Sequence, residues 1–480
     1  MKLAAASAAL ALAACSPGAA LRPQLPPMSD IGQSRAADGA TFTEDVVYNF
    51  RLNARRRSPL FPAGLLLPGQ KGNFYGTTSA TAGFRGGAGT VYELTRDRSL
   101  RVLSRTARRE GSLPLWGVAR GRGRGLFGAT LEGGDLDCLG GLGCGTVFKL
   151  KPAGSEFQKE TLHRFSGRSD GAEPSSGLTL DSRGTLYGTT GLGGGTGCAG
   201  RGCGIVYKFT PAGQRYDETV VYRFRGGADG STPAGGVVLD PAGNLYGVTT
   251  RGGISCFESD AGCGTVYELV PRRAGFKKIV LYRFRGSAVG DGAFPAPTLT
   301  RRPDGRLYGA TLGGGTGSCL YGGCGTVFEL VPSGATYRER VLLSFDPARG
   351  RVPPGPSGLL LRQRQNELYG TTSAGGRFTS YFFPHGCGTA FVIYLPSGSS
   401  RVIHEFKGPP EDGAAPTDGV IEGPGDALYG ATARGGTGEC LGFSGCGTIF
   451  RLALLRPPSQ GPPGGRPEAG WAPVRKWRNW

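Results

Sequence analysis

The sequence predicts an all-β fold: a seven-bladed β-propeller with four antiparallel strands in each blade. Two motifs that recur with one shared period predict it. A five-residue pattern close to Leu-Tyr-Gly-Thr-Thr begins at Phe74, Leu126, Leu186, Leu245, Leu307, Leu368 and Leu428. A four-residue pattern close to Gly-Thr-Val-Tyr follows each copy, beginning at Gly89, Gly145, Gly204, Gly264, Gly325, Gly388 and Gly447. Two motifs in one register indicate a repeat architecture, and a unit of about 60 residues is longer than the rungs of most solenoids.

Each repeat contains four strand-like segments, which the third repeat shows well. They are residues 176–181, 185–190, 204–209 and 218–224. The Asp-Ser-Arg-Gly sequence between the first two segments supplies the residues that a tight hairpin turn demands. Four antiparallel strands repeated seven times fit a propeller of blades around a central channel.

The two ends of the repeat region predict how the ring closes. Residues 45–50 resemble the fourth strand of other repeats, whereas the last repeat stops after its third strand, at Leu452. We therefore expect residues 45–50 to supply the missing outer strand of the last blade, which pairs two otherwise open edges. The predicted propeller domain spans residues 44–452.

The N-terminus predicts export. Met1 and Lys2 precede an apolar run from Leu3 to Ala14, which has the form of a secretory signal and is too short to span a bilayer. The end of this run resembles the lipobox of bacterial lipoproteins, which implies that Cys15 is acylated and becomes the mature N-terminus. We expect residues 1–14 to be a signal peptide and residues 15–43 a lipidated, flexible spacer. The alternative is an ordinary signal cleaved near Ala20, with Cys15 discarded.

This resemblance implies a location and a first partner. An acylated Cys15 would insert its chains into the membrane, because several acyl chains on one residue give stable anchoring. We therefore expect an exported protein, lipid-anchored at the outer membrane or cell surface. Residues 453–480 form a basic tail rich in proline and glycine that we expect to be disordered. Its alternative use is an interfacial patch built from Trp471, Trp477 and Trp480.

Ten cysteines form five local pairs in the loops between the second and third strands. The pairs are Cys138/Cys144, Cys198/Cys203, Cys256/Cys263, Cys319/Cys324 and Cys440/Cys446. In an exported chain this spacing predicts one disulfide in each of five blades, worth about 2 kcal/mol apiece. The competing interpretation, zinc binding, would need four ligands where each pair supplies two. Cys387 lacks a local partner, so it is either a buried free thiol or a site of intermolecular pairing.

Four aspartates recur in the loops that enter the blades, each followed by glycine. They are Asp170, Asp229, Asp291 and Asp412. The structural interpretation is an Asx turn that orients the chain. Propeller connectivity puts these loops on the same face as the cysteine-paired loops. The alternative is therefore a ring of carboxylates around the channel mouth that binds a ligand or a cation such as Ca²⁺.

The repeat also resembles a known family. The order Gly-Leu-x-Leu-Asp, Gly-x-Leu-Tyr-Gly-Thr-Thr and Gly-Cys-Gly-Thr-Val-Phe is similar to that of the GloVer tandem-repeat family, over roughly residues 45–452 and with weaker copies in the first two units. This resemblance implies a surface-attached propeller and brings no established enzymatic activity with it.

Charge and histidine placement favour binding over catalysis. The net charge of +19 suits anionic surfaces, but no nucleic-acid-binding module accompanies it, so we expect no nucleic-acid partner. His163 and His404 occupy one position of the repeat, and His385 stands alone in a loop. The sequence shows no Ser/His/Asp order and no nucleotide-binding glycine loop, so we expect no catalytic residue, metal or cofactor.

We therefore expect a monomeric binding or scaffold protein of the bacterial cell envelope. Its ligand would be a polysaccharide, a protein or an anionic envelope component, bound on the loop-rich face. The alternative is a hydrolase or lyase acting on envelope polysaccharide or peptide. Its chemistry would lie in residues that break the repeat.

Overall fold

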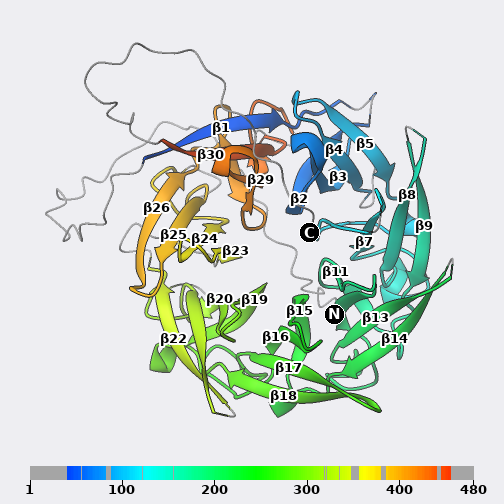
Figure 1. Cartoon of the computed structure of the whole chain (residues 1–480), viewed down its shortest axis with the longest axis vertical. Coiled ribbons are helices and arrows are strands. Elements are labelled where there is room, and N and C mark those ends of the chain that lie inside the picture. Colours follow the sequence, from blue (N-terminus) through cyan, green and yellow to red (C-terminus); the bar gives the residue numbers. More distant parts are fainter. Residues whose placement is uncertain are drawn as a thin grey trace, which may run out of the picture.

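A computed structural model describes residues 41–455, except 54, 56, 83–87, 122, 155, 214, 318, 320–321, 335, 347–355, 380–384 and 441–444. These residues form seven antiparallel sheets arranged radially around one axis (Figure 1). The colours of Figure 1 run once around the ring in sequence order, so consecutive sheets are neighbours. The predicted seven-bladed β-propeller is confirmed, and we number its blades 1 to 7 along the chain.

The first four blades are built in strand order from the axis outward. Blade 1 contains β2 (Pro59–Pro68), β3 (Phe74–Thr81), β4 (Thr90–Leu94) and β5 (Leu100–Arg105). Blade 2 contains β6 (Val118–Arg120), β7 (Leu126–Thr130), β8 (Thr146–Ala153) and β9 (Glu156–Arg164). Blade 3 contains β10 (Ala172–Pro174), β11 (Thr179–Leu180), β12 (Leu186–Leu192), β13 (Ile205–Ala212) and β14 (Arg215–Arg223). Blade 4 contains β15 (Ser231–Leu239), β16 (Leu245–Arg251), β17 (Thr265–Arg272) and β18 (Gly275–Arg283).

The last three blades repeat this order. Blade 5 contains β19 (Gly292–Arg301), β20 (Leu307–Gly314), β21 (Thr326–Ser333) and β22 (Thr336–Ser344). Blade 6 contains β23 (Pro356–Arg362), β24 (Glu367–Thr372), β25 (Thr389–Tyr394) and β26 (Ser399–Glu405). Blade 7 contains β27 (Gly413–Pro416), β28 (Ile421–Glu422), β29 (Leu428–Gly435), β30 (Thr448–Leu455) and β1 (Thr41–Asn49). Short 3-10 turns lie at Gln70–Gly72, Arg108–Glu110, Leu139–Gly141, Gly227–Asp229, Ser287–Val289 and Pro424–Asp426.

The N-terminal strand closes the ring as predicted. β1 pairs antiparallel with β30, from Thr41 opposite Leu455 to Asn49 opposite Thr448. Figure 1 shows the two strands side by side at the outer edge of blade 7. The pairing reaches a few residues beyond the predicted 44–452 at both ends, because β1 and β30 extend each other. Phe50 follows β1 and packs against Tyr92 of blade 1, with ring centroids 5.6 Å apart.

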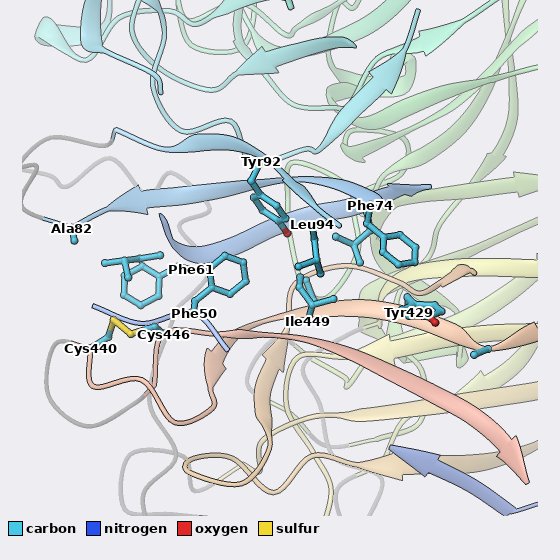
Figure 2. Packing of buried hydrophobic residues seen from close by; sticks show 14 residues of the cluster. Phe50, Phe61, Phe74, Ala82, Tyr92, Leu94, Tyr429, Cys440, Cys446 and Ile449 are labelled. Atoms are coloured by element: carbon cyan, nitrogen blue, oxygen red, sulfur yellow. A yellow bond between two sulfur atoms is a disulfide. The ribbon is translucent and has the colours of Figure 1, made fainter. Parts of the chain in front are cut away.

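The core lies between blades rather than within them. Figure 2 shows the junction of blades 7 and 1, where Phe50, Tyr92, Leu94 and Ile449 pack together beside the Cys440–Cys446 disulfide. At most junctions a phenylalanine that follows an outer strand packs edge-on or tilted against the second-motif aromatic of the next blade. These pairs are Phe50–Tyr92, Phe165–Tyr207, Phe224–Tyr267, Phe284–Phe328, Phe345–Phe391 and Phe406–Phe450. Each blade therefore buries its apolar faces only by contact with its neighbours.

The two sequence motifs recur because their residues pack on each other across β-strands 2 and 3 of a blade. A Cβ atom on Gly247 would lie 2.6 Å from the Cζ atom of Tyr267, so only glycine lets that ring cross the neighbouring strand. The last threonine of the first motif also bonds the threonine of the second motif. These hydroxyl pairs are Thr78–Thr90, Thr130–Thr146, Thr249–Thr265, Thr311–Thr326, Thr372–Thr389 and Thr432–Thr448, at 2.8–2.9 Å. The motifs are therefore structural.

Candidate functional site on the loop face

The two ends of the propeller differ in their connections. Because the strands of a blade alternate in direction, the loops from strand 2 to strand 3 and from strand 4 to the next blade lie at one end. We call this end the loop face; in blade 3 it includes residues 193–204 and 224–230. The opposite end carries the short turns after strands 1 and 3. The long, variable connections of the molecule are thus gathered on the loop face.

Five disulfides hold the loops between strands 2 and 3. They are Cys138–Cys144, Cys198–Cys203, Cys256–Cys263, Cys319–Cys324 and Cys440–Cys446, with Cα atoms 5.1–6.0 Å apart, as disulfide geometry requires. The structure therefore contains all five predicted pairs. Cys387 is 2% exposed, and the structure has no free cysteine among its described residues, so the free-thiol alternative is wrong. Cys15, the predicted site of lipidation, lies outside the described residues.

In blades 2 and 3 the disulfide packs against the chain that enters the next blade. A Cβ atom on Gly226 would lie 3.1 Å from Cys198 Sγ, and one on Gly167 would lie 2.5 Å from Cys138 Sγ. In blade 4 the side chain of Glu258 adds a hydrogen bond, because its Oε1 accepts the backbone N–H of Ser287 at 2.6 Å. In these three blades the two loops thus form one connected base on the loop face.

The four predicted aspartates cap the turns that enter the blades. Asp229 accepts the backbone N–H of Arg225 at 2.9 Å and the hydroxyl of Tyr222 at 2.8 Å. Asp291 accepts the N–H of Arg285 and the hydroxyl of Tyr282 at the same two distances. A carboxylate that holds its own turn in this way is an Asx-type capping residue.

Asp170 and Asp412 repeat this arrangement with histidine in place of tyrosine. Asp170 accepts the N–H of Ser166 at 2.9 Å and lies 3.2 Å from His163 Nε2, while Asp412 lies 2.9 Å from His404 Nε2. Burial alone would raise the pKa of Asp170, but hydrogen bonds from His163 and Ser166 lower it to about 2. All four carboxylates bind residues near the ends of outer strands. Binding of a cation to any of them stays a prediction.

A further charged position was missed by the sequence reasoning. A phenylalanine follows the outer strand of most blades. Six residues before it, five blades carry an ionisable side chain. These residues are Glu44, Lys159, Glu218, Lys278 and Glu339. The signal was present in the repeat alignment, but only the structure shows that the position faces the aspartate turn of the preceding junction.

Glu44 and Asp412 bring two carboxylates together at the junction of blades 6 and 7. One carboxylate oxygen of Glu44, one of Asp412 and a ring nitrogen of His404 all lie within 4.8 Å of one another. Burial, then the charges of Asp412 and Asp45, raise the pKa of Glu44 to about 8. Glu44 Oε1 is buried and has no hydrogen-bond partner among the described residues. The same is true of the Oε1 atoms of Glu218 and Glu339. Two carboxylates this close together favour binding of a proton by one of them.

Lys278 shows the opposite solution at the junction of blades 3 and 4. Its Nζ atom donates to Asp229 Oδ1 at 3.0 Å and also to the Asp229 carbonyl oxygen. The ammonium lies 4.7 Å from the ring centre of Phe224, and its side chain is only 4% exposed. Burial lowers the pKa of Lys278, and Asp229 partly offsets this effect. Glu258 lies close to Cys256 and Cys263 in blade 4, but the sulfur atoms of these two cysteines are bonded to each other in a disulfide.

The inner strands of neighbouring blades approach each other closely. A Cβ atom on Gly64 would lie 2.6 Å from the carbonyl carbon of Trp116 in blade 2, and one on Gly235 would lie 2.5 Å from the Pro297 oxygen in blade 5. Neighbouring inner strands thus contact each other backbone to backbone. The two best-formed pockets among the described residues lie elsewhere and contain no histidine or cysteine. One, of about 30 Å³, lies between Phe345 and Val402, and the other, of about 290 Å³, between Arg302 and Arg364.

Helices play a minor part in the described chain. None of those found there is long and apolar enough to act as a membrane-spanning segment.

The first half of the chain, which contains several copies of the two motifs, matches a known repeat family. Residues 37–256 match the family model described as the Gloeobacter/Verrucomicrobia repeat. No curated protein matches the chain.

Several solved structures are similar in part. A protein proposed to be a 6-phosphogluconolactonase from Bacteroides uniformis has 13% identity and a TM-score of 0.45, over 74% of this chain and 90% of that one. A gluconolactonase from Xanthomonas campestris has 14% identity and a TM-score of 0.35, over 71% and 96%. A hypothetical selenium-binding protein from Sulfolobus tokodaii has 11% identity and a TM-score of 0.44, over 69% and 74%. These values carry no argument about what this chain does.

Proposed function

Because residues 37–256 match the Gloeobacter/Verrucomicrobia repeat model, in agreement with the motifs, we propose that this chain is a binding or scaffold protein of the bacterial cell envelope. The propeller would be tethered through an acylated Cys15 and would bind an envelope polysaccharide or protein on its loop face. The observation that carries this proposal is the contrast on that face between a repeated base and non-repeated tips.

Three kinds of contact make the repeated base of the loop face rigid. Disulfides close the loops, aspartates cap the adjoining turns, and the two elements pack on each other. A scaffold of this kind lowers the entropy that a loop loses when it binds a ligand.

The tips carry exposed apolar side chains that serve no packing role in the ring. Phe257 is 82% exposed and Val289 is 60% exposed. They project from two neighbouring loops that the Glu258–Ser287 hydrogen bond holds together. Ile254 is exposed beside them, and Arg285 has a side chain that is 56% exposed. Exposed aromatic and aliphatic groups next to arginine are typical of binding surfaces.

The test is binding of the purified chain to an array of envelope glycans and peptidoglycan fragments. We expect a Phe257→Ser/Val289→Ser variant to lose at least tenfold in affinity for the polymer that binds. The matched control, Val402→Ser/Leu454→Ser, removes two exposed apolar side chains from β26 and β30 and should bind normally. Failure of the wild-type chain to bind any polymer, or equal binding by both variants, would contradict the proposal. Turnover of a polymer would instead favour the hydrolase or lyase alternative.

The tether has its own test. Cells that express the chain are labelled with a fatty-acid analogue, and we expect label on the wild type and none on Cys15→Ala. An ordinary signal peptide cleaved near Ala20 would leave both chains unlabelled.

A further inference from the structure

Closure of the ring depends on the seating of one strand. β1 pairs with β30 on one side and contacts blade 6 on the other. Phe42 packs near Tyr369, with ring centroids 6.4 Å apart, and two residues later Glu44 faces the aspartate turn at Asp412. β1, the strand that closes the ring, therefore places a carboxylate at the junction between blades 6 and 7.

The charges around Glu44 are mostly negative. Asp45 is the next residue of β1, Asp412 comes from the loop that enters blade 7, and His404 comes from β26. Lys407 is the cation that faces Glu44, and it is exposed to solvent, which screens its charge. The buried Glu44 Oε1 has no hydrogen-bond partner among the described residues. An ionised Glu44 would therefore repel Asp412 with little compensation.

The junction of blades 3 and 4 shows what this position requires. There Lys278 stands in the place of Glu44 and bonds Asp229, the counterpart of Asp412. A positive charge at this position pairs with the aspartate turn. A glutamate can seat there without repulsion only if it carries a proton.

We propose that β1 is a pH-sensitive clasp, held closed while Glu44 is protonated and loosened when Glu44 ionises beside Asp412. Because the pKa of Glu44 is raised on folding from 4.5 to about 8, its stabilising effect is fully present below pH 4.5 and is lost as the pH rises through 8. This inference concerns how the ring opens, and it needs neither the ligand nor the lipid tether of the proposed function.

The test is hydrogen exchange of the purified full chain at pH 6 and pH 9, corrected for intrinsic exchange rates. The readout is the protection of β1 relative to β5, the outer strand of blade 1, which carries Leu100 at the position that Glu44 has in β1. The part of the pKa shift between these two pH values corresponds to about a hundredfold, which solvent and salt screening reduce to roughly tenfold. We expect β1 to lose that protection at pH 9 while β5 keeps its own.

Three variants separate the mechanism from simple structural damage. Glu44→Gln mimics the protonated acid and should make β1 protection equal at both pH values. Glu44→Lys copies the Lys278 arrangement and should do the same. Glu218→Gln removes the counterpart carboxylate at an internal junction and should leave the tenfold change in β1 intact. A wild-type β1 that is equally protected at both pH values overturns the proposal, as does a tenfold change that survives in Glu44→Gln. If Glu44→Lys does not fold, Glu44→Gln decides.

Discussion

The buried ion pair between Lys278 and Asp229 should respond asymmetrically to removal of its two members. Asp229→Asn leaves an ammonium that is 4% exposed without its counter-charge, which typically costs about 3 kcal/mol of unfolding free energy. Lys278→Met removes the charge but keeps an apolar stem against the ring of Phe224. Asp229 is 23% exposed and retains its bonds from Tyr222 and Arg225, so this change should cost only about 1 kcal/mol.

The assay is urea denaturation at pH 7 of both single variants and the double variant. We expect the double variant to cost little more than Lys278→Met, which gives a coupling energy of about 3 kcal/mol. Arg285→Ala is the control, because its ion pair with Asp291 has a 3.4 Å separation and an arginine side chain that is 56% exposed. That change should cost under about 0.5 kcal/mol. Greater damage from Lys278→Met than from Asp229→Asn, or additive costs, would refute the reasoning.

Three further predictions concern the repeat itself. Gly247→Ala forces a Cβ against the aromatic ring of the second motif and should lower the unfolding temperature far more than Gly213→Ala, which meets no atom within 4 Å and bears only the strain of its φ of +61°. Replacing both Cys198 and Cys203 by alanine should cost about 2 kcal/mol in urea while circular dichroism stays unchanged. Asp170→Asn should abolish the stability that the wild type loses in acid titrations as the pH falls from 4 toward 2, because the pKa of Asp170 is lowered on folding; an unchanged acid transition would contradict this.

Much of the fold followed from local sequence because the motif residues act on their near neighbours. Gly247 and Tyr267 lie on adjacent strands of one hairpin, and so do Thr249 and Thr265. Their spacing therefore revealed the strands, the register and the number of blades. The cysteine pairs were equally readable, since each closes a loop of a few residues. The aspartate turns belonged to the same class, because each carboxylate bonds a residue only a few positions away.

The sequence by itself thus determined the seven blades, the disulfides and the strand that closes the ring. Only the tertiary structure decided what lies between blades. Glu44 and Asp412 are far apart in the chain and meet because β1 returns to the last blade. The repeat position of Glu44 is occupied by glutamate in some blades and by lysine in others. The motif therefore does not predict whether a junction holds a proton or an ion pair. Such contacts escape the repeat pattern because each depends on which two side chains face each other across a junction, whereas the period fixes only the backbone that carries them.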